Sequence, residues 1–247
     1  MSSSEQIPEC KNLNLYWDRY AFIKFKNDFL NGMQERISYE ILDKIKSIDM
    51  NTTIDHIKKR RDNLKEKLKD KAILDLELKL NGRLLVGSGS PSIFEVGMTF
   101  SRNYGVPIIP SSALKGCFSH YCAEKDIFSR EEFKDIFGED LGSNPENARG
   151  NVVFLDAFPT SKVEFGLDVV NNHFQRYYMG GEVPNDWYNP IPVVYLTVTK
   201  GVFRFTLVSI DSISSELSSK IKTEFANMLS SYGIGSKTNY GYGRFKK

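Results

Sequence analysis

The chain has 247 residues, enough for one elaborated domain or one and a half, and 40% of them are hydrophobic, so it can bury a substantial core. Its net charge of +2 excludes a histone-like polycation, and any contact with nucleic acid must therefore be local. The three cysteines form no C-x-x-C pair, which argues against a zinc site; with no signal peptide and no apolar run of about 20 residues, we expect a cytoplasmic protein without membrane contact.

The first part of the chain, residues 1–71, is predicted to be a helical extension. Apolar side chains recur with the spacing of one helix face over residues 13–20 and again over 33–48. The pattern breaks at residues 51–53. A segment with more Lys and Arg than Asp and Glu follows at residues 56–71.

This segment contains the densest run of cations in the sequence, residues 58–61. One interpretation is a solvated helix held by i,i+4 pairs, with Asp62 and Glu66 near Lys65 and Lys69. The other is a helix that faces phosphates. The sequence alone favours the solvated helix.

The periodicity changes at Ala72, where leucines begin to alternate with charged residues. This alternation predicts a strand over residues 72–80 with one face buried. Asn81 and Gly82 predict a tight hairpin, from which residues 83–86 would return along the strand.

A helix is predicted over residues 111–123, with Ser111 or Ser112 as its N-cap. Lys115 in the first turn opposes the helix dipole, and Gly116 costs about 1 kcal/mol relative to alanine. Both residues make sense if an anion binds at this N-terminus and another backbone passes close by. The alternative is a solvated lysine and a glycine chosen for helix–sheet packing.

Residues 124–149 are predicted to be a charged excursion with a short helix over 131–137. A strand follows over residues 151–158 and is apolar on both faces except at Asp156. Because a buried carboxylate needs partners, we expect loop amides to bind Asp156.

Residues 159–192 are predicted to be irregular, because they are rich in Gly, Asn and Pro. His173 and Arg176 lie there among the aromatic residues Tyr177 and Tyr178. Aromatic rings interleaved with cations suit an RNA strand, and they suit a subunit interface nearly as well.

The last third of the chain is more regular. Residues 193–199 and 202–210 predict a hairpin, and an apolar stripe over 213–232 predicts a helix that ends at Gly233. Residues 243–246 can then close the sheet as an edge strand.

A glycine-rich loop lies between that helix and that strand, within residues 233–245. Its glycines permit positive φ, and its N–H groups can form an anion-binding concavity. Lys237 and Arg244 add charge, and Tyr240 and Tyr242 offer rings for base stacking. The order Gly-Ser-Lys is not the Gly-Lys-Ser/Thr of a mononucleotide P-loop. The alternative is a plain glycine-rich turn.

The predicted elements follow the order β-α-β-β-α-β, which is typical of an α+β, ferredoxin-like (RRM-like) fold with an antiparallel sheet and helices on one face. Together with the glycine-rich loop, this order resembles the RAMP proteins of CRISPR systems over residues 72–247. Residues 106–116, 150–159 and 168–173 are more specific, and they resemble the sixth subunit of the type III-B Cmr effector complex. One departure is the Asn pair before His173, where that family often has Thr-Pro.

The resemblance implies two parts, the extension 1–71 and a RAMP domain over 72–247. It also implies a non-catalytic RNA-binding structural subunit in antiviral defence that caps the 3′ end of the guide RNA. The expected partners are the guide RNA and also the target RNA, a backbone RAMP subunit and the small helical subunit, with no cofactor or metal. The candidate RNA-binding residues are Arg102, Ser111, Ser112, Lys115, His173, Arg176, Gly235, Lys237, Thr238, Tyr240 and Arg244.

Two other functions stay open. Some RAMP proteins process guide-precursor RNA without metal, and here His173 would be the general acid or base, with His120 as the weaker candidate. A third interpretation is a protein-only assembly module whose aromatic loop, residues 173–188, contacts a neighbour. Between residues 81 and 110, Glu95 is the only acid, so the resemblance does not extend to the target-cutting aspartate of backbone subunits.

Overall fold

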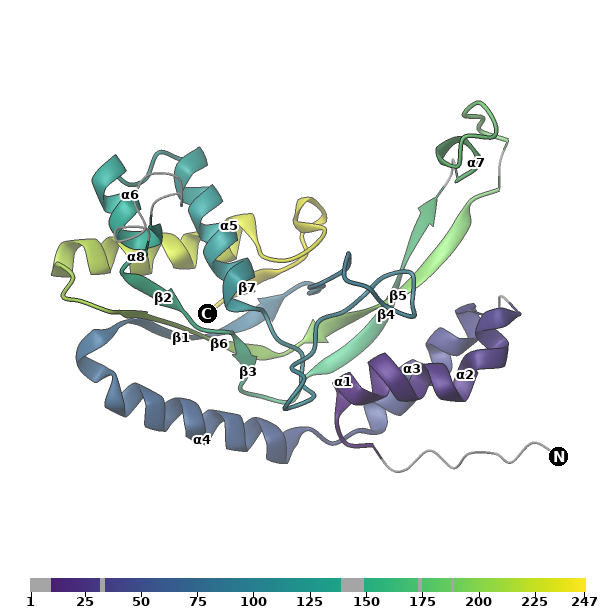
Figure 1. Ribbon diagram of the computed structural model, residues 1–247, viewed down its shortest axis with the longest axis horizontal. Helices are drawn as coiled ribbons and strands as arrows, with labels where there is room; N and C mark the ends of the chain where they lie inside the picture. The colour runs from purple at the N-terminus through teal and green to yellow at the C-terminus, as the bar shows by residue number, and fades with distance from the viewer. Residues whose placement is uncertain (1–9, 32–33, 139–148, 173–174, 188) are drawn as a thin grey trace.

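The computed structural model describes residues 10–31, 34–138, 149–172, 175–187 and 189–247. A main antiparallel sheet lies at the centre, with helices on both faces, and a two-stranded arm projects from one end (Figure 1). The main sheet contains β1 (Ala72–Asn81), β2 (Val152–Phe154), β3 (Phe158–Pro159), β6 (Val202–Ser209) and β7 (Arg244–Lys246). The arm contains β4 (Glu164–Asn172) and β5 (Ile191–Lys200).

The predicted ferredoxin-like topology is confirmed. Strand order in the main sheet is β2-β6-β1-β7, with β3 also paired to β6. The two crossover helices are α5 (Ser111–Glu124) and α8 (Ser215–Asn227). They cover one face of the sheet together with α6 (Arg130–Phe137), as Figure 1 shows. The short helix predicted over 131–137 is α6, which a capping box of Ser129 and Glu132 starts.

The helical nature of residues 13–71 is also confirmed. The segment forms α1 (Leu13–Leu15), a π-helical turn (Tyr16–Tyr20), α2 (Ala21–Leu30), α3 (Gln34–Ser47), α4 (Asn51–Lys67) and a 3-10 turn (Lys69–Lys71). Leu13, Ile45 and Ile57 are buried in the same hydrophobic cluster as the sheet residues. The extension therefore packs on the remainder of the chain, while its status as a separate unit ending at residue 71 stays a prediction.

The core lies between the sheet and α5 and α8. Alternation along β6 turns Phe203, Phe205 and Leu207 inward, where all three are fully buried. Phe205 contacts Phe225 of α8 and Phe245 of β7 edge to face, at 6.1 and 5.0 Å between ring centroids. These contacts fix α8 and β7, and so both ends of the glycine-rich loop.

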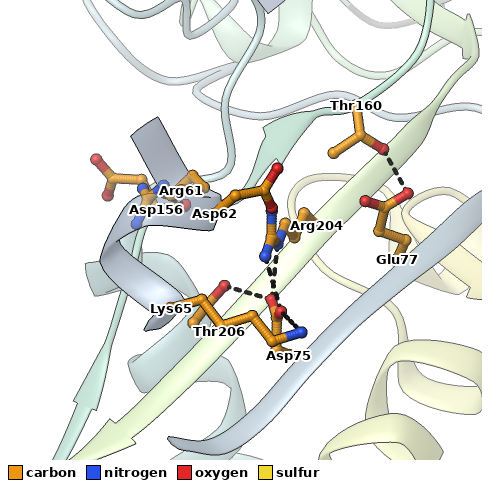
Figure 2. A network of polar contacts seen from close by, with 9 residues as sticks. All are labelled: Arg61, Asp62, Lys65, Asp75, Glu77, Asp156, Thr160, Arg204 and Thr206. Carbon is orange, nitrogen blue, oxygen red and sulfur yellow. Dashed lines mark hydrogen bonds and ion pairs between the residues drawn. The ribbon is translucent and has the colours of Figure 1, made fainter. Parts of the chain in front are cut away.

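Helix α4 lies across the opposite face of the sheet, where charged residues of β1 and β6 point (Figure 2). Arg204, only 7% exposed, donates through Nε to Asp75 at 2.7 Å and through a terminal nitrogen to Asp62 at 2.6 Å. Lys65 of α4 lies 2.9 Å from the other Asp75 oxygen. The prediction that Asp62 and Lys65 take part in pairs along the solvated helix is therefore wrong, because both bind the sheet.

Two strand pairings predicted from the sequence are wrong. Residues 83–86 do not return along β1; instead Leu84 forms an isolated bridge with Val198 of β5. Both edges of β1 are already occupied, by β6 and β7. The two strands expected to form a hairpin exist as β5 and β6, but they do not pair with each other. Strand β6 pairs with β1, β2 and β3, and β5 pairs with β4.

The prediction of an irregular segment from 159 to 192 is wrong over residues 164–172, which form β4. Beyond the body of the protein both faces of the arm contact solvent, and Val169 and Val170 are exposed. A strand without a buried face shows no clean alternation of polar and apolar residues, so the pattern was missed. The short helix α7 (Gln175–Tyr178) lies at the tip of the arm (Figure 1).

Candidate nucleic-acid interface

The glycine-rich loop is packed tightly against the segment that follows β1. The N–H of Ser236 donates to the carbonyl of Leu85 at 2.8 Å, and the N–H of Gly243 donates to the carbonyl of Arg83 at 2.7 Å. Gly235 has φ +93°, and a Cβ there would collide with the Leu85 carbonyl. The alternative interpretation, a plain glycine-rich turn, therefore explains part of the glycine content, because the backbone at Gly235 must approach the carbonyl of Leu85 closely.

The loop turns at Lys237, whose backbone adopts the left-handed conformation with φ +61°. This conformation costs a non-glycine residue about 1–2 kcal/mol. The ammonium group of Lys237 lies 4.4 Å from the centroid of the buried Tyr195 ring, a cation–π contact. The loop therefore holds a partly exposed cation in a defined place. Thr238 begins the 3-10 turn Thr238–Tyr240 that follows.

The two loop tyrosines have different environments. Tyr240 is 84% exposed, so its ring is available to a ligand. Tyr242 is 9% exposed, and its hydroxyl donates to Asp168 and lies 3.1 Å from the hydroxyl of Tyr195. The expectation that Tyr242 offers a ring for base stacking is therefore wrong; Tyr242 instead joins the loop to the base of the arm.

Asp168 is the centre of this junction. Besides Tyr242, Arg83 approaches it with Nε 3.3 Å from the carboxylate, and the N–H of Val169 donates to it at 2.8 Å. Burial alone would raise the pKa of Asp168, but these donors and the nearby Lys237 together lower the pKa below its usual range. Burial, followed by the bond to Asp168, raises the pKa of Tyr242. Asp168, Arg83 and Lys237 therefore lie together at a junction of three segments of the chain. One carboxylate and two cations give this junction a net charge of +1.

Helix α5 lies beside the loop, as the thiol of Cys117 donates to the carbonyl of Gly233 at 3.4 Å. Its N-cap is Pro110, so the prediction of a serine N-cap is wrong. The N–H of Ser111 instead donates to Asp156 at 2.7 Å, which confirms that a backbone amide binds Asp156. The amino end of α5 therefore already holds a carboxylate of the protein, and the anion expected there is at least partly internal.

Lys115 and Gly116 lie one turn further along α5, next to this junction with the loop. A Cβ at Gly116 would meet nothing within 4 Å, and the residue is exposed. Helix–sheet packing therefore does not require this glycine. Lys115 is partly exposed, as are Lys237 and Arg244. The Nε of Arg244 is buried and has no acceptor among the described residues.

The remaining candidates lie elsewhere. Arg102 is exposed in the turn before Tyr104, where its carbonyl accepts from the Asn12 side chain at 3.1 Å. Arg176 belongs to α7 on the arm, and His173 lies outside the described residues. The structure thus brings α5 and the glycine-rich loop together, but it does not add Arg102 or Arg176 to that surface.

Sequence reasoning missed the junction of Asp168, Tyr195 and Arg83. Asp168 lies in one of the passages that carried the family resemblance, but nothing in the local pattern links it to Tyr242. The signal that was present is the run Phe165, Gly166, Leu167, a short alternation at the start of β4.

The described ranges contain neither a metal-binding cluster nor a membrane-spanning helix. No group of three or more His, Cys, Asp or Glu side chains there is arranged to hold a metal ion. Likewise, none of the helices described is both long and apolar enough to cross a bilayer.

The topology and the loop are those of a CRISPR-associated protein class. The sequence profile of the RAMP superfamily matches residues 77–246, more than half of the chain, and the chain therefore belongs to this superfamily. It is 33% identical over 226 residues to the CRISPR system Cmr subunit Cmr6 of Pyrococcus furiosus, an alignment covering 68% of this chain and 66% of the relative. It is 30% identical over 198 residues to Cmr6 of Saccharolobus solfataricus, with coverage of 77% and 64%.

One solved structure supports the same relationship. A chain in the cryo-EM structure of the type III-B Cmr-beta bound to cognate target RNA superposes with a TM-score of 0.62 and 30% identity. The match covers 78% of this chain and 65% of that one. This chain therefore spans about two thirds of the length of its curated relatives.

Proposed function

We propose that this protein is a non-catalytic, RNA-binding structural subunit of a type III-B CRISPR effector complex, located in the cytoplasm. In this role it caps the 3′ end of the guide RNA and contacts a backbone RAMP subunit. Two findings support the proposal: the relatives are Cmr6 subunits, and one similar chain belongs to a complex bound to target RNA.

The observation that carries RNA binding is the surface where α5 meets the glycine-rich loop. On the helix side, Lys115 is a partly exposed cation and Gly116 is helix backbone without a covering side chain; on the loop side, Lys237 is a partly exposed cation and Tyr240 an exposed ring. Cations that hold phosphates and a ring that stacks on any base bind a strand without reading its sequence. This property suits a subunit that must accept every guide.

The test is the double variant Lys237→Ala, Arg244→Ala. We expect weaker retention of single-stranded RNA for every sequence tried, with a salt slope lower by about 0.7 for each lost phosphate contact. Fluorescence anisotropy across a salt series measures both quantities. Lys222, an exposed cation of α8, provides the matched control Lys222→Ala. An unchanged salt slope in the double variant rejects this site.

The contact with a neighbouring subunit is assigned to the arm. Its tip exposes apolar side chains that no part of the described chain covers, and Trp187 is 88% exposed. The exposed apolar residues at the tip are Tyr177, Tyr178, Met179, Val183 and Trp187. Such a patch is typical of a protein–protein contact.

The alternative is a metal-independent endoribonuclease that uses His173. His120, the other candidate, is exposed and lies 3.8 Å from Glu124 of the same helix. The test is incubation of the purified protein with labelled repeat RNA in EDTA. Discrete cleavage that the variant His173→Ala loses favours the nuclease over the structural subunit.

A further inference from the structure

The structure contains a groove between α4 and the segment around Tyr104, on the other side of the sheet from the glycine-rich loop. It encloses about 370 Å³. Its walls combine two guanidinium groups of α4 with two aromatic rings and one carboxylate, and Ile57 and Leu64 form its apolar flank. The basic run 58–61 thus contributes two arginines to one groove.

The two arginines have different roles in this groove. Arg61 is half-buried, donates to the carbonyl of Asp156 at 3.0 Å, and lies 5.1 Å from the Phe158 ring. Figure 2 shows Arg61 beside Asp156. Arg60 is exposed, and its guanidinium lies 5.9 Å from the centroid of Tyr104. It makes no ion pair within the described residues, so its charge is available.

The two aromatic rings of the groove contact each other. Tyr104 packs edge to face against Phe158, with 5.8 Å between ring centroids. Arg60 lies over the ring of Tyr104, and guanidinium planes are surfaces on which unpaired bases stack.

Asp156 supplies an acceptor at the same place. Its Oδ1 accepts from the N–H of Ser111, which leaves Oδ2 without a hydrogen-bond donor among the described residues. A ribose 2′-hydroxyl can donate to such an oxygen, whereas deoxyribose cannot. A ribonucleotide fits this arrangement better than an acidic peptide does, because its 2′-hydroxyl can donate to Asp156 whereas a carboxylate side chain can only accept.

We propose that this groove binds one nucleotide of a single RNA strand, with the base on Arg60 and Tyr104, the phosphate on Arg60 and the ribose against Asp156. The inference rests on the proposed RNA binding and adds a second contact, on the opposite face of the sheet. The strand would then pass around the rim of the sheet between the two sites.

The experiment compares the full-length variants Arg60→Ala and Arg60→Lys with Lys67→Ala. Lys67 is an exposed cation on the same helix outside the groove, so it controls for charge alone. Labelled single-stranded RNA of mixed sequence and DNA of the same sequence are the probes, titrated across a salt series.

We expect Arg60→Ala to weaken RNA binding by about 5-fold to 100-fold, the range for the loss of one stacked base. Arg60→Lys should keep the salt slope but not the affinity, because lysine retains the charge without the plane. The preference for RNA over DNA should fall in both Arg60 variants. If Arg60→Ala and Lys67→Ala weaken binding equally, the groove is rejected. Polyglutamate that binds in an Arg60-dependent way, while RNA does not, also overturns the proposal.

The two sites can be separated in one further measurement. In the Lys237→Ala, Arg244→Ala background, Arg60→Ala should still reduce the remaining RNA affinity. If the loop variants have no effect and Arg60→Ala does, the groove stands while the loop site fails. If only the loop variants act, the groove fails.

Discussion

At the residue scale, Asp168 joins segments that lie far apart in the sequence. It accepts from Tyr242 of the glycine-rich loop and lies beside Arg83, which donates in turn to Thr197 of β5 at 2.9 Å. The candidate surface and the base of the arm therefore share one polar junction.

Tyr242→Phe tests this junction, since it removes only the hydroxyl. It should destabilise the protein by about 1–3 kcal/mol, because Asp168 and Tyr195 lose a partner in a poorly solvated place. Urea denaturation measures the change. Tyr240→Phe is the control, because that ring is exposed and should change stability little. Equal stability of Tyr242→Phe and the unchanged protein contradicts the structural role.

At the element scale, α4 and the strands show what local sequence can predict. Helices can be predicted from local sequence because their period is local: the helix expected over residues 111–123 is α5, whereas the break expected at residues 51–53 is wrong, because α4 begins at Asn51. Strand partners were not, because pairing depends on which edges remain free: residues 83–86 follow a strong turn signal, yet β7 already occupies that edge. The composition of the glycine-rich loop identified it as a candidate site. The sequence could not show which of its glycines are needed for close packing within the chain and which leave room for a ligand.

The contact between α4 and the sheet depends on Asp75. Burial would raise the pKa of this carboxyl, but the hydrogen bonds from Arg204 and Lys65 lower it to about 2 from 3.8. Because the folded pKa is below the unfolded value, the stabilisation is fully present above about pH 4 and is lost as the pH falls toward 2.

Asp75→Asn should therefore cost about 3–5 kcal/mol near neutral pH, because it leaves Arg204 partly uncompensated in a buried place. The difference from the unchanged protein should shrink as the pH falls through this window. Denaturation curves at several pH values measure it. The control is Glu77→Gln on the same strand, where the exposed carboxylate accepts from Thr160 at 3.1 Å. A difference that stays constant with pH contradicts the assigned ion network.

At the scale of the whole molecule, the arm and the RNA surface should be separable functions. The double variant Tyr178→Ser, Trp187→Ser should leave the thermal stability of the isolated protein unchanged, because both rings are exposed. It should reduce co-purification with the other subunits several-fold while RNA binding by the isolated protein persists. Tyr240→Ser provides the reciprocal control. Full co-purification of the arm variant contradicts the assignment of the arm to subunit contact.

The position of α4 has a consequence for how this protein meets its ligand. RRM modules present their open sheet as a platform for bases, whereas here Asp62 and Lys65 close that platform with a helix. On this side of the sheet, bases can therefore contact the protein only at loops and at the edges of the sheet, a few bases at each place. We therefore expect the protein to protect separate short groups of nucleotides along its edge, with little dependence on base identity. A continuous run of bases bound across the face of the sheet is not expected.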